Sequence, residues 1–459
     1  MRERLIDEKD RHAIGWVKRV LEYETMVPKF SEELISAPAE TLKKYGFPVT
    51  PEDISFLNRD PKDPRHLDAR FPDSKGALYA EFVNRKLGSI SSIRNDCTPK
   101  DQRFAKWRDI QIGRCVLGLG PQSGSIIHVP IAFELAKGCS VGCEFCGLNA
   151  GPLQGLFRYT DENAALWREV LTRAKDLIGD AAGEATLYFG TEPLDNPDYE
   201  LFKDDFRDIF GTLPQITTAV STRNIERLRP LIKELNEDGR FIYRFSILSQ
   251  EMFEQICKAF TPEELVFVEL LPQYPEAPGN HFAAVGRNTG DNAICDEVPG
   301  GGTISCISGF LVNMYARTVT LTTPVWCDDD HPEGQIILAK EEFTDAKDLF
   351  DRIERMIADM KVYLEPDDIV CTWPYLEYVR TDDGPQIESS RGTIVKLQGK
   401  DDENLVEKVF ELIKEGCYTR REIVTKIVNS SEFPAVQSQY LFFLINRFWS
   451  KGIFTEKEG

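Results

Sequence analysis

The chain has 459 residues, of which 42% are apolar, and carries 55 basic and 75 acidic side chains for a formal net charge of −20. A chain of this length and composition can bury a full hydrophobic core and form several domains. Its negative charge would repel a phosphate backbone, which basic patches normally attract, so nucleic acid is not an expected partner.

The N-terminus is charged and contains no apolar run of the length of a signal peptide. No later stretch of the sequence approaches the roughly 18–20 apolar residues that a helix needs to span a bilayer. The 11 cysteines are too few and too scattered for a disulfide scaffold. We therefore expect a soluble, cytoplasmic protein with no membrane partner.

Residues 1–105 are expected to form an N-terminal helical unit, which we interpret as a docked cap without chemistry of its own. Thr50 and Pro51 mark one helix start, because a hydroxyl N-cap and a proline at the first helical position suit the unpaired amides of a first turn. A Pro- and Asp-rich connector follows over residues 60–72. Other helices predicted from apolar periodicity cover Arg11–Glu24, Phe30–Tyr45, Gly76–Leu87 and Arg103–Cys115.

Strands and helices alternate across residues 106–345, beginning with an apolar β-type run at Ser125–Leu135. Such alternation is typical of an α/β fold in which βαβ units surround a parallel sheet, open or curled into a barrel. Functional sites on these sheets lie at the carboxyl ends of the strands. The predicted helices are Glu162–Leu177, Tyr199–Phe210, Ile225–Leu235 and Gln250–Phe260; the predicted strands are Ala185–Phe189, Gln215–Val220, Phe241–Leu248 and Leu265–Leu271, with a strand or strand pair over Ile307–Thr322.

The pattern changes in the last third of the chain. A Pro-, Gly- and Asn-rich loop over residues 273–302 is long enough for a lid or a substrate-facing insertion. Residues 346–390 are expected to form a helix and an irregular linker. Residues 391–459 outline a winged helix: three helices with short turns and a terminal β element. The segments are helix Phe343–Met360, strand Gly392–Leu397, helices Leu405–Glu415, Thr419–Ile427 and Ala435–Lys451, and strand Gly452–Phe454.

Cys139, Cys143 and Cys146 form a C-x3-C-x2-C array directly after the first predicted strand. Three thiolates so close together can bind a soft metal centre but cannot complete a four-ligand site, so one coordination position would stay open for a small molecule. The alternatives are a zinc site with a distant fourth ligand and three buried structural thiols. Zinc sites usually contain two separated ligand pairs, and the sequence has no second C-x2-C or H-x3-H pair.

With Phe145 before its last cysteine, the array resembles that of the radical S-adenosylmethionine enzymes. In that family three cysteines hold three irons of a [4Fe–4S] cluster, and the fourth iron chelates the amino and carboxylate groups of S-adenosylmethionine. The resemblance implies a partial (β/α)6-type barrel and two cofactors, one [4Fe–4S] cluster and S-adenosylmethionine. It also implies an electron donor such as a flavodoxin or ferredoxin, and a 5′-deoxyadenosyl radical that abstracts a hydrogen atom.

A second motif, Gly190–Pro197, follows the second predicted strand and begins with Gly190, Thr191, Glu192 and Pro193. A glutamate in a Pro-bounded turn at a strand end is a suitable acceptor for an ammonium group; an exposed turn is the plain alternative. The motif resembles the G-G-E-P loop that holds the ammonium of S-adenosylmethionine in this family, with Thr191 in place of the usual second glycine. Because both motifs follow neighbouring strands, we expect them to meet in one pocket.

The same resemblance indicates four further cofactor-binding residues, for the ribose and carboxylate of S-adenosylmethionine. Thr218 and Ser221 lie at the end of the third predicted strand, and Arg244 and Ser246 lie on the fourth. Threonine and serine are also ordinary strand and cap residues, so each of these positions has an interpretation without a ligand.

Residues 80–345 further resemble the peptide epimerases of proteusin-type natural-product pathways. The resemblance is carried by the runs around Cys139, at Glu192–Tyr199 and at Ile304–Met314, and no second dense group of cysteines follows the predicted barrel. Those enzymes invert an L-residue of a ribosomally made peptide: a radical takes the Cα hydrogen, and a cysteine thiol returns one from the opposite face.

Such a reaction needs an unligated thiol near the site, since an S–H bond is weak enough to quench a Cα radical. Cys306, beside the strand that resembles the family, is the first candidate and Cys327 is the second. A free cysteine is more often a buried core residue than a hydrogen donor. The run over residues 326–334 departs from the family pattern, which leaves the choice of substrate open.

The tail, Leu405–Phe454, resembles the small winged-helix elements that bind the leader of such precursors by adding a strand to a sheet edge. It therefore implies a ribosomal precursor peptide with a leader as partner. A DNA-binding winged helix should have a basic recognition helix, whereas Ala435–Leu444 carries no basic residue. A packing module without a ligand is the remaining alternative.

Taken with the motifs, these resemblances predict a radical S-adenosylmethionine peptide epimerase, an isomerase that converts L- to D-residues in a ribosomal precursor peptide. The alternatives are another radical modification of a peptide, such as C-methylation or crosslinking, and a non-catalytic metal-bound scaffold that binds peptides.

Overall fold

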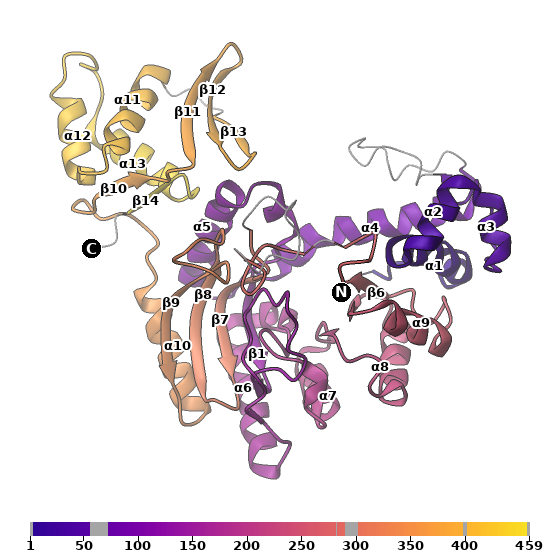
Figure 1. Ribbon diagram of the computed structural model, residues 1–459. Coiled ribbons are helices and arrows are strands. Elements are labelled where there is room, and N and C mark those ends of the chain that lie inside the picture. The colour runs from indigo at the N-terminus through magenta and orange to yellow at the C-terminus, as the bar shows by residue number, and fades with distance from the viewer. Residues whose placement is uncertain (1–2, 56–71, 281, 290–301, 398–401, 457–459) are drawn as a thin grey trace.

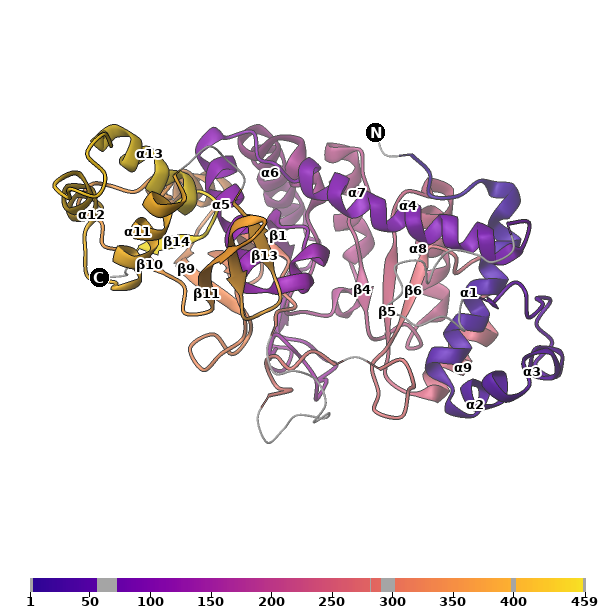
Figure 2. The same cartoon turned by 90° about the horizontal axis from the view of Figure 1, so that it is seen from above.

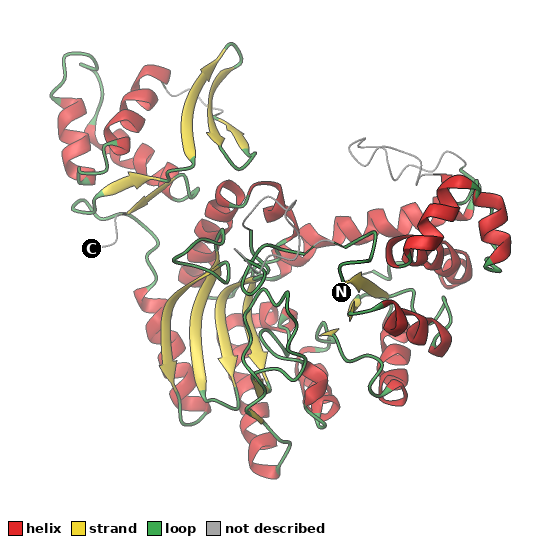
Figure 3. Cartoon of the chain, in the orientation of Figure 1, coloured by secondary structure: helices red, strands yellow, loops and turns green. Residues whose placement is uncertain are grey.

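The computed structural model describes residues 3–55, 72–280, 282–289, 302–397 and 402–456. The N-terminal helices and a small C-terminal domain lie at opposite ends of the molecule, with the central strands and their helices between them (Figure 1). The strands gather in separate groups and do not form a closed ring (Figure 3). No described helix combines the length and apolar character needed to cross a bilayer.

The N-terminal residues are helical, but two predicted boundaries are wrong. The predicted helix at Phe30–Tyr45 is divided at Ala37, because Pro38 has no amide donor and disfavours a helical backbone at the residue before it. At Thr50 the described backbone forms a turn instead of starting a helix, and most of the predicted connector falls in residues 56–71, outside the described residues. The helices are α1 (Arg11–Met26), α2 (Pro28–Ser36), α3 (Pro38–Lys44), α4 (Lys75–Asp96) and α5 (Gln102–Gly118).

The central strands form two separate, partial sheets, which confirms the predicted α/β class, whereas the single parallel sheet of a partial (β/α)6-type barrel is not formed among the described residues. One sheet has the order β1-β7-β8-β9 and the other β4-β5-β6. The predicted strand at Ala185–Phe189 contributes only an isolated bridge between Thr186 and Gln215, and the Thr186 carbonyl accepts the Phe133 N–H at 2.9 Å. After Thr186, hydrogen bonds between side chains replace the backbone hydrogen bonds of a sheet: the Tyr188 hydroxyl donates to the Gln215 side chain at 2.5 Å.

The strand order also differs from that of a six-stranded parallel barrel. β7 pairs with β1 in parallel, whereas β8 and β9 continue the sheet as antiparallel strands, and β9 was not predicted. The result is a mixed α/β fold with open, partial sheets. The strands are β1 (Val129–Glu134), β2 (Ala136–Lys137), β3 (Gly155–Leu156), β4 (Thr217–Thr218), β5 (Tyr243–Ile247), β6 (Val268–Pro272), β7 (Ile307–Asn313), β8 (Thr318–Pro324) and β9 (Gln335–Glu342).

Helices follow the strands as predicted and bury apolar faces against them. Each begins where expected to within a few residues, and side chains such as Thr160 and Ser249 cap their first turns. The largest buried cluster joins these helices to the strands, with Phe133, Trp167 and Phe245 fully buried. The predicted loop at 273–302 falls partly in residues 281 and 290–301, outside the described residues. The helices are α6 (Asp161–Ile178), α7 (Tyr199–Phe210), α8 (Ile225–Asp238), α9 (Gln250–Ala259) and α10 (Ala346–Asp359).

Helix α1 covers β6, the edge strand of the sheet β4-β5-β6, at the edge where another parallel strand could otherwise pair. The Lys18 ammonium donates to the Val268 carbonyl of β6 at 2.7 Å and pairs with Glu22, which also accepts from Arg19 at 2.9 Å. All three charged side chains are buried. A buried charge is tolerated only when it is paired and hydrogen-bonded, so this group fixes the position of α1 and protects the sheet edge.

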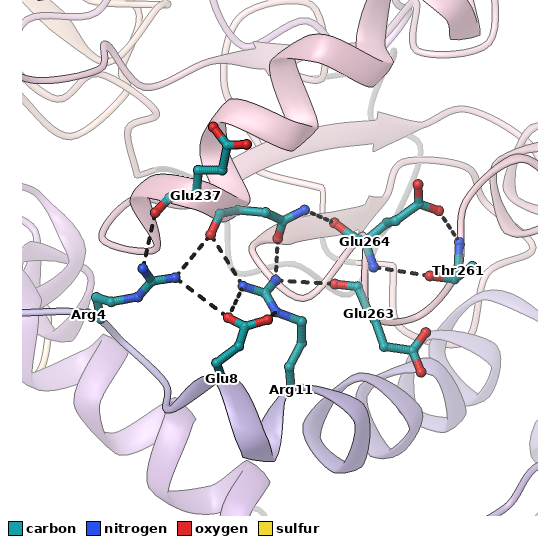
Figure 4. A network of polar contacts seen from close by, with 8 residues as sticks. Arg4, Glu8, Arg11, Glu237, Thr261, Glu263 and Glu264 are labelled. Carbon is teal, nitrogen blue, oxygen red and sulfur yellow. Dashed lines mark hydrogen bonds and ion pairs between the residues drawn. The ribbon is translucent and has the colours of Figure 1, made fainter.

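Polar contacts extend this attachment along the N-terminal segment (Figure 4). Arg4 donates to the carbonyls of Asn236 and Glu237 at 3.2 Å, and Arg11 donates to the Asn236 side chain at 2.6 Å. Arg11 also reaches the Glu263 carbonyl at 3.4 Å. The N-terminal helices are therefore joined to the helix layer around β6. Figure 2 shows α4 extending from these helices toward the centre of the molecule.

The C-terminal domain has a second hydrophobic core, to which α5 contributes Ile110 and Leu117. The linker predicted as irregular contains strands, and an Asp-Asp-Gly turn at residues 382–384 closes the β11–β12 hairpin. We missed this signal, which is typical of tight hairpins. The Arg391 guanidinium lies over the rings of Trp326 and Tyr375, with its Cζ 4.6 and 4.4 Å from the ring centroids. This side chain therefore joins the domain to the core. The elements are β10 (Val370–Thr372), β11 (Leu376–Thr381), β12 (Gly384–Ser389), β13 (Ile394–Lys396), α11 (Glu403–Lys414), α12 (Arg420–Val428), α13 (Ser438–Trp449) and β14 (Phe454–Glu456).

Replacing Lys18 by Ala tests the attachment of α1. The substitution leaves the buried Glu22 carboxylate with Arg19 alone and frees the Val268 carbonyl. We expect the free energy of unfolding in urea to fall by about 3 kcal/mol. The control is Lys233→Ala, because Lys233 is 77% exposed in its pair with Glu237 and should contribute no more than about 1 kcal/mol. Equal losses in the two variants would show that the buried group does not hold the helix.

Candidate functional site

The three cysteines lie on a loop whose two ends are joined. β2 and β3 pair at its base, and Cys139 forms a bridge with Pro152, with the Cys139 N–H donating to the Gly151 carbonyl at 2.9 Å. Gly138 has φ +78°, and a Cβ there would lie 2.1 Å from the Pro152 carbonyl oxygen. Only glycine allows this closure, which holds the cysteine loop at the end of β1.

The cysteine side chains are half-buried, and all three sulfurs are free of disulfides. Backbone amides point at two of them: the N–H groups of Val141 and Ala150 donate to the Cys139 and Cys146 sulfurs at 3.5 Å. Burial first, and then the neighbouring thiolates of Cys139 and Cys146, raise the pKa of Cys143 to about 11. Cys143 is therefore close enough to the other two sulfurs for their charges to oppose its ionisation.

This donor set fits a cationic iron–sulfur cluster, although the side chains are not preassembled. Among the described residues, no group of three or more His, Cys, Asp or Glu side chains is arranged to hold a single metal ion. Three mutually repelling thiolates with adjacent amide donors would be stabilised by a positively charged metal centre. The ligation of such a cluster by Cys139, Cys143 and Cys146 stays a prediction.

The Gly190–Pro193 turn begins beside the end of β1. The Gly190 N–H donates to Glu134 Oε1 at 2.7 Å, and the Asn313 side chain donates to Glu134 Oε2 at 3.0 Å. Glu134 is buried, which raises its pKa. This carboxylate therefore ties together β1, β7 and the turn. Our sequence reasoning missed Glu134 and Asn313, because both occupy ordinary positions at strand ends.

Glu192 is 4% exposed and binds the end of β4 with both carboxylate oxygens. Its Oε1 accepts the Thr218 hydroxyl at 2.7 Å and the Leu194 N–H at 3.0 Å, and its Oε2 accepts the Ala219 N–H at 2.8 Å. Burial raises the pKa of Glu192, and these bonds oppose the rise. In this structure Glu192 binds protein donors, so its contact with an ammonium group stays a prediction. Pro193 is buried and Thr191 half-buried in the same turn.

Asp195 joins this turn to the cysteine loop. It accepts the Ser140 N–H at 2.9 Å and the Ser140 hydroxyl at 2.5 Å. Arg223 donates to the same hydroxyl at 2.8 Å. The two motifs that we expected to meet are therefore in direct contact, through a residue of the second motif to which the sequence analysis gave no role. Its position three residues after Glu192 in the same turn was the available signal.

The other predicted cofactor-binding residues are distributed along neighbouring strand ends. Ser221 is fully buried, and its hydroxyl has no hydrogen-bond partner among the described residues, which is costly unless a ligand supplies one. Arg244 is 48% exposed and pairs with Glu269 at 3.0 Å. Ser246 is half-buried and lies on the same face of β5 as Arg244, two residues on.

The structure separates the two candidate hydrogen donors. Cys306 precedes β7, and its carbonyl accepts the Val129 N–H at 2.8 Å. Burial raises the pKa of Cys306, and the charge of Arg244 opposes this rise, so the thiol lies near a predicted cofactor residue. Cys327 instead donates to the Pro332 carbonyl at 3.2 Å. The charge of Arg244 acts on the pKa of Cys306 and is not among the causes that act on Cys327.

Phe145 does not point freely into solvent. Its ring stacks on Phe282 with centroids 4.9 Å apart and an interplanar angle of 23°. We predicted that Phe145 lies beside a cofactor. Its ring is accompanied there by Phe282, which comes from the segment after β6. Sequence alone gave no sign of this pairing, since the two residues are separated by 136 positions in the chain.

Comparisons with known proteins find one close sequence relative. No family model matches the chain. A solved structure, BtrN in complex with AdoMet and 2-DOIA, aligns with 51% of this chain and 87% of its own at 15% identity, and its TM-score of 0.32 is too low to assign a shared fold. The uncharacterized protein y4wI of Sinorhizobium fredii is 36% identical over 366 residues, which is 76% of this chain and 71% of that protein. The chain belongs to the family of this y4wI protein.

Proposed function

We propose that this protein is a radical S-adenosylmethionine enzyme, and within that class a peptide epimerase. The observation that carries the proposal is the direct contact between the cysteine loop and the Glu192 turn, made by Asp195 and Ser140. A cluster with an open coordination position and a site for an ammonium group would then share one pocket. When bound, the [4Fe–4S] cluster and S-adenosylmethionine would supply a radical able to abstract a hydrogen atom.

The roles of the protein's own residues follow from their positions. Cys139, Cys143 and Cys146 would hold the cluster. Glu192 and Thr218 would bind the ammonium and ribose side of S-adenosylmethionine, since they already form one hydrogen-bonded unit at 2.7 Å. Ser221, three residues after Thr218, contributes a buried hydroxyl that has no hydrogen-bond partner among the described residues. The Arg244 charge and the Ser246 hydroxyl, on one face of β5, suit a carboxylate.

Cys306 would complete the reaction by returning a hydrogen atom to the peptide. Its S–H bond breaks, and a C–H bond forms at Cα on the face opposite to the one from which hydrogen was removed. The resulting thiyl radical is reduced to the thiol by one electron and one proton, the electron coming from a donor such as a flavodoxin or ferredoxin. Burial favours this chemistry because it keeps the Cys306 thiol protonated.

The C-terminal domain would bind the leader of a ribosomal precursor peptide. Strands β11, β12 and β13 form an antiparallel sheet that is followed by helices α11, α12 and α13. Among the described residues β13 pairs only with β12, and Ile394 on it is 60% exposed. An open strand edge beside an exposed apolar side chain is suited to the addition of an extended peptide.

Anaerobic reconstitution with iron and sulfide tests the cluster. The wild-type protein should gain visible iron–sulfur absorption and release 5′-deoxyadenosine when it is reduced with S-adenosylmethionine. Cys143→Ala should lose both, because two thiolates cannot hold a cubane cluster. The control is Cys417→Ala, which removes an exposed cysteine of the C-terminal domain. No absorption in the wild type would favour a non-catalytic metal-bound scaffold.

Mass spectrometry in deuterated water tests the reaction type. An epimerase adds one deuteron for each inverted residue of a co-expressed precursor peptide, whereas C-methylation or crosslinking also changes the product mass in ordinary water. Cys306→Ala should still release 5′-deoxyadenosine but form no D-residues. Cys327→Ala is the matched control and should epimerise normally. Normal epimerisation by Cys306→Ala would contradict the assigned donor.

A substitution on β13 tests whether the C-terminal domain binds the leader, because it should change KM only for substrates that carry a leader. Ile394→Asp should raise KM for a precursor with its leader, by about tenfold if one apolar contact is lost, and leave kcat unchanged. A precursor without its leader should show no difference between the variant and the wild type. The alternative, a packing module without a ligand, predicts equal KM values for Ile394→Asp and the wild type on both substrates.

A further inference from the structure

The segment between β6 and β7 contacts the cysteine loop, and Arg287 makes most of these contacts. Its side chain donates to the Cys143 carbonyl at 2.9 Å, to the Ala150 carbonyl and to the Asn149 side chain at 3.2 Å. Its backbone N–H donates to the Cys146 carbonyl at 3.0 Å. One residue therefore binds the loop at four points.

The backbone around Arg287 approaches the cysteine loop closely. Gly286 has φ +65°, and a Cβ at this position would lie 2.5 Å from the carbonyl oxygens of Cys146 and Gly147. The Gly286 N–H donates to the Pro332 carbonyl at 2.7 Å, which fixes the segment from its other side. Phe282, five residues before Arg287, stacks on Phe145. The contact is thus a packed interface and not one flexible side chain on a surface.

These contacts matter because the cysteine loop has little regular structure of its own. Between β2 and β3 the described backbone consists of turns, bends and single bridges. Asn149 within it has φ +47°, a conformation that most residues avoid. The carbonyls of Cys143 and Cys146 each accept one amide of the loop itself, at 3.3 and 3.1 Å. The planar guanidinium adds up to five further donors in a fixed arrangement that Lys cannot reproduce. Arg287 is therefore suited to hold the loop backbone in one conformation.

We propose that Arg287 is a positioning residue for the metal-binding cysteines. It holds the carbonyls of Cys143 and Ala150 and so fixes the backbone from which the Cys143 and Cys146 thiols project. The identity of the bound cluster rests on the proposed function, whereas the ordering of the loop by Arg287 does not.

Amide hydrogen exchange of the metal-free protein tests the ordering directly. Arg287→Ala removes three side-chain hydrogen bonds, so exchange of the peptides covering residues 139–150 should accelerate by about tenfold or more. The matched control is Arg94→Ala, because the Arg94 side chain also donates three hydrogen bonds, in its case to the carbonyls of Ser123, Gly124 and Ile126 in another loop. That variant should leave exchange over 139–150 unchanged. Unchanged exchange in Arg287→Ala would overturn the proposal.

Arg287→Lys gives a second test that does not depend on the alanine variant folding. It keeps the charge and most of the apolar stem but loses the forked contact, so iron retained per chain after reconstitution should fall below that of the wild type. The electron paramagnetic resonance signal of the reduced cluster should broaden, as expected for a heterogeneous site. Full iron retention with an unchanged signal in both variants would refute a positioning role. A wild-type protein that binds no iron would instead refute the proposed function and leave the exchange result standing.

Discussion

Two buried carboxylates organise the centre of this molecule. Glu134 and Glu192 are both buried, and each must find hydrogen-bond donors because an unpaired buried charge is costly. Glu134 finds them on Gly190 and Asn313, and Glu192 finds them on Thr218, Leu194 and Ala219. The donors come from neighbouring strands and from the turn between them, so satisfying the two charges brings these strand ends together.

This arrangement compensates for a sheet that is interrupted at the same place. The segment at 185–189 contributes one bridge instead of a strand, and backbone ladders therefore do not connect β1 with β4. Carboxylate and side-chain hydrogen bonds take over the connection. Side chains can reach across an irregular gap, whereas backbone ladders require neighbouring strands at a fixed spacing of about 4.8 Å. The interruption leaves the Glu192 turn in contact with the cysteine loop.

The cysteine loop depends on contacts from both neighbouring segments. Asp195 binds Ser140 near its start, and Arg287 binds the carbonyls of Cys143, Cys146 and Ala150 further on. The thiolates of Cys139 and Cys146 raise the pKa of Cys143, so the metal-free loop is not stabilised by its own sulfurs. External contacts must therefore supply the order that a metal centre would otherwise impose.

Local sequence determined the helices, the cysteine array and the Glu192 turn, since apolar periodicity, capping residues and motif spacing act within a few residues. Tyr199–Phe210, for example, is predicted and observed with the same boundaries, because its apolar spacing and the glycine after it depend on no distant partner. Only the tertiary structure decided that β7 pairs with β1, that α1 covers β6, and that Asp195 and Arg287 contact the cysteine loop. Each of these contacts joins residues that are distant in the chain or depends on charges being buried together, and no local pattern encodes such a choice.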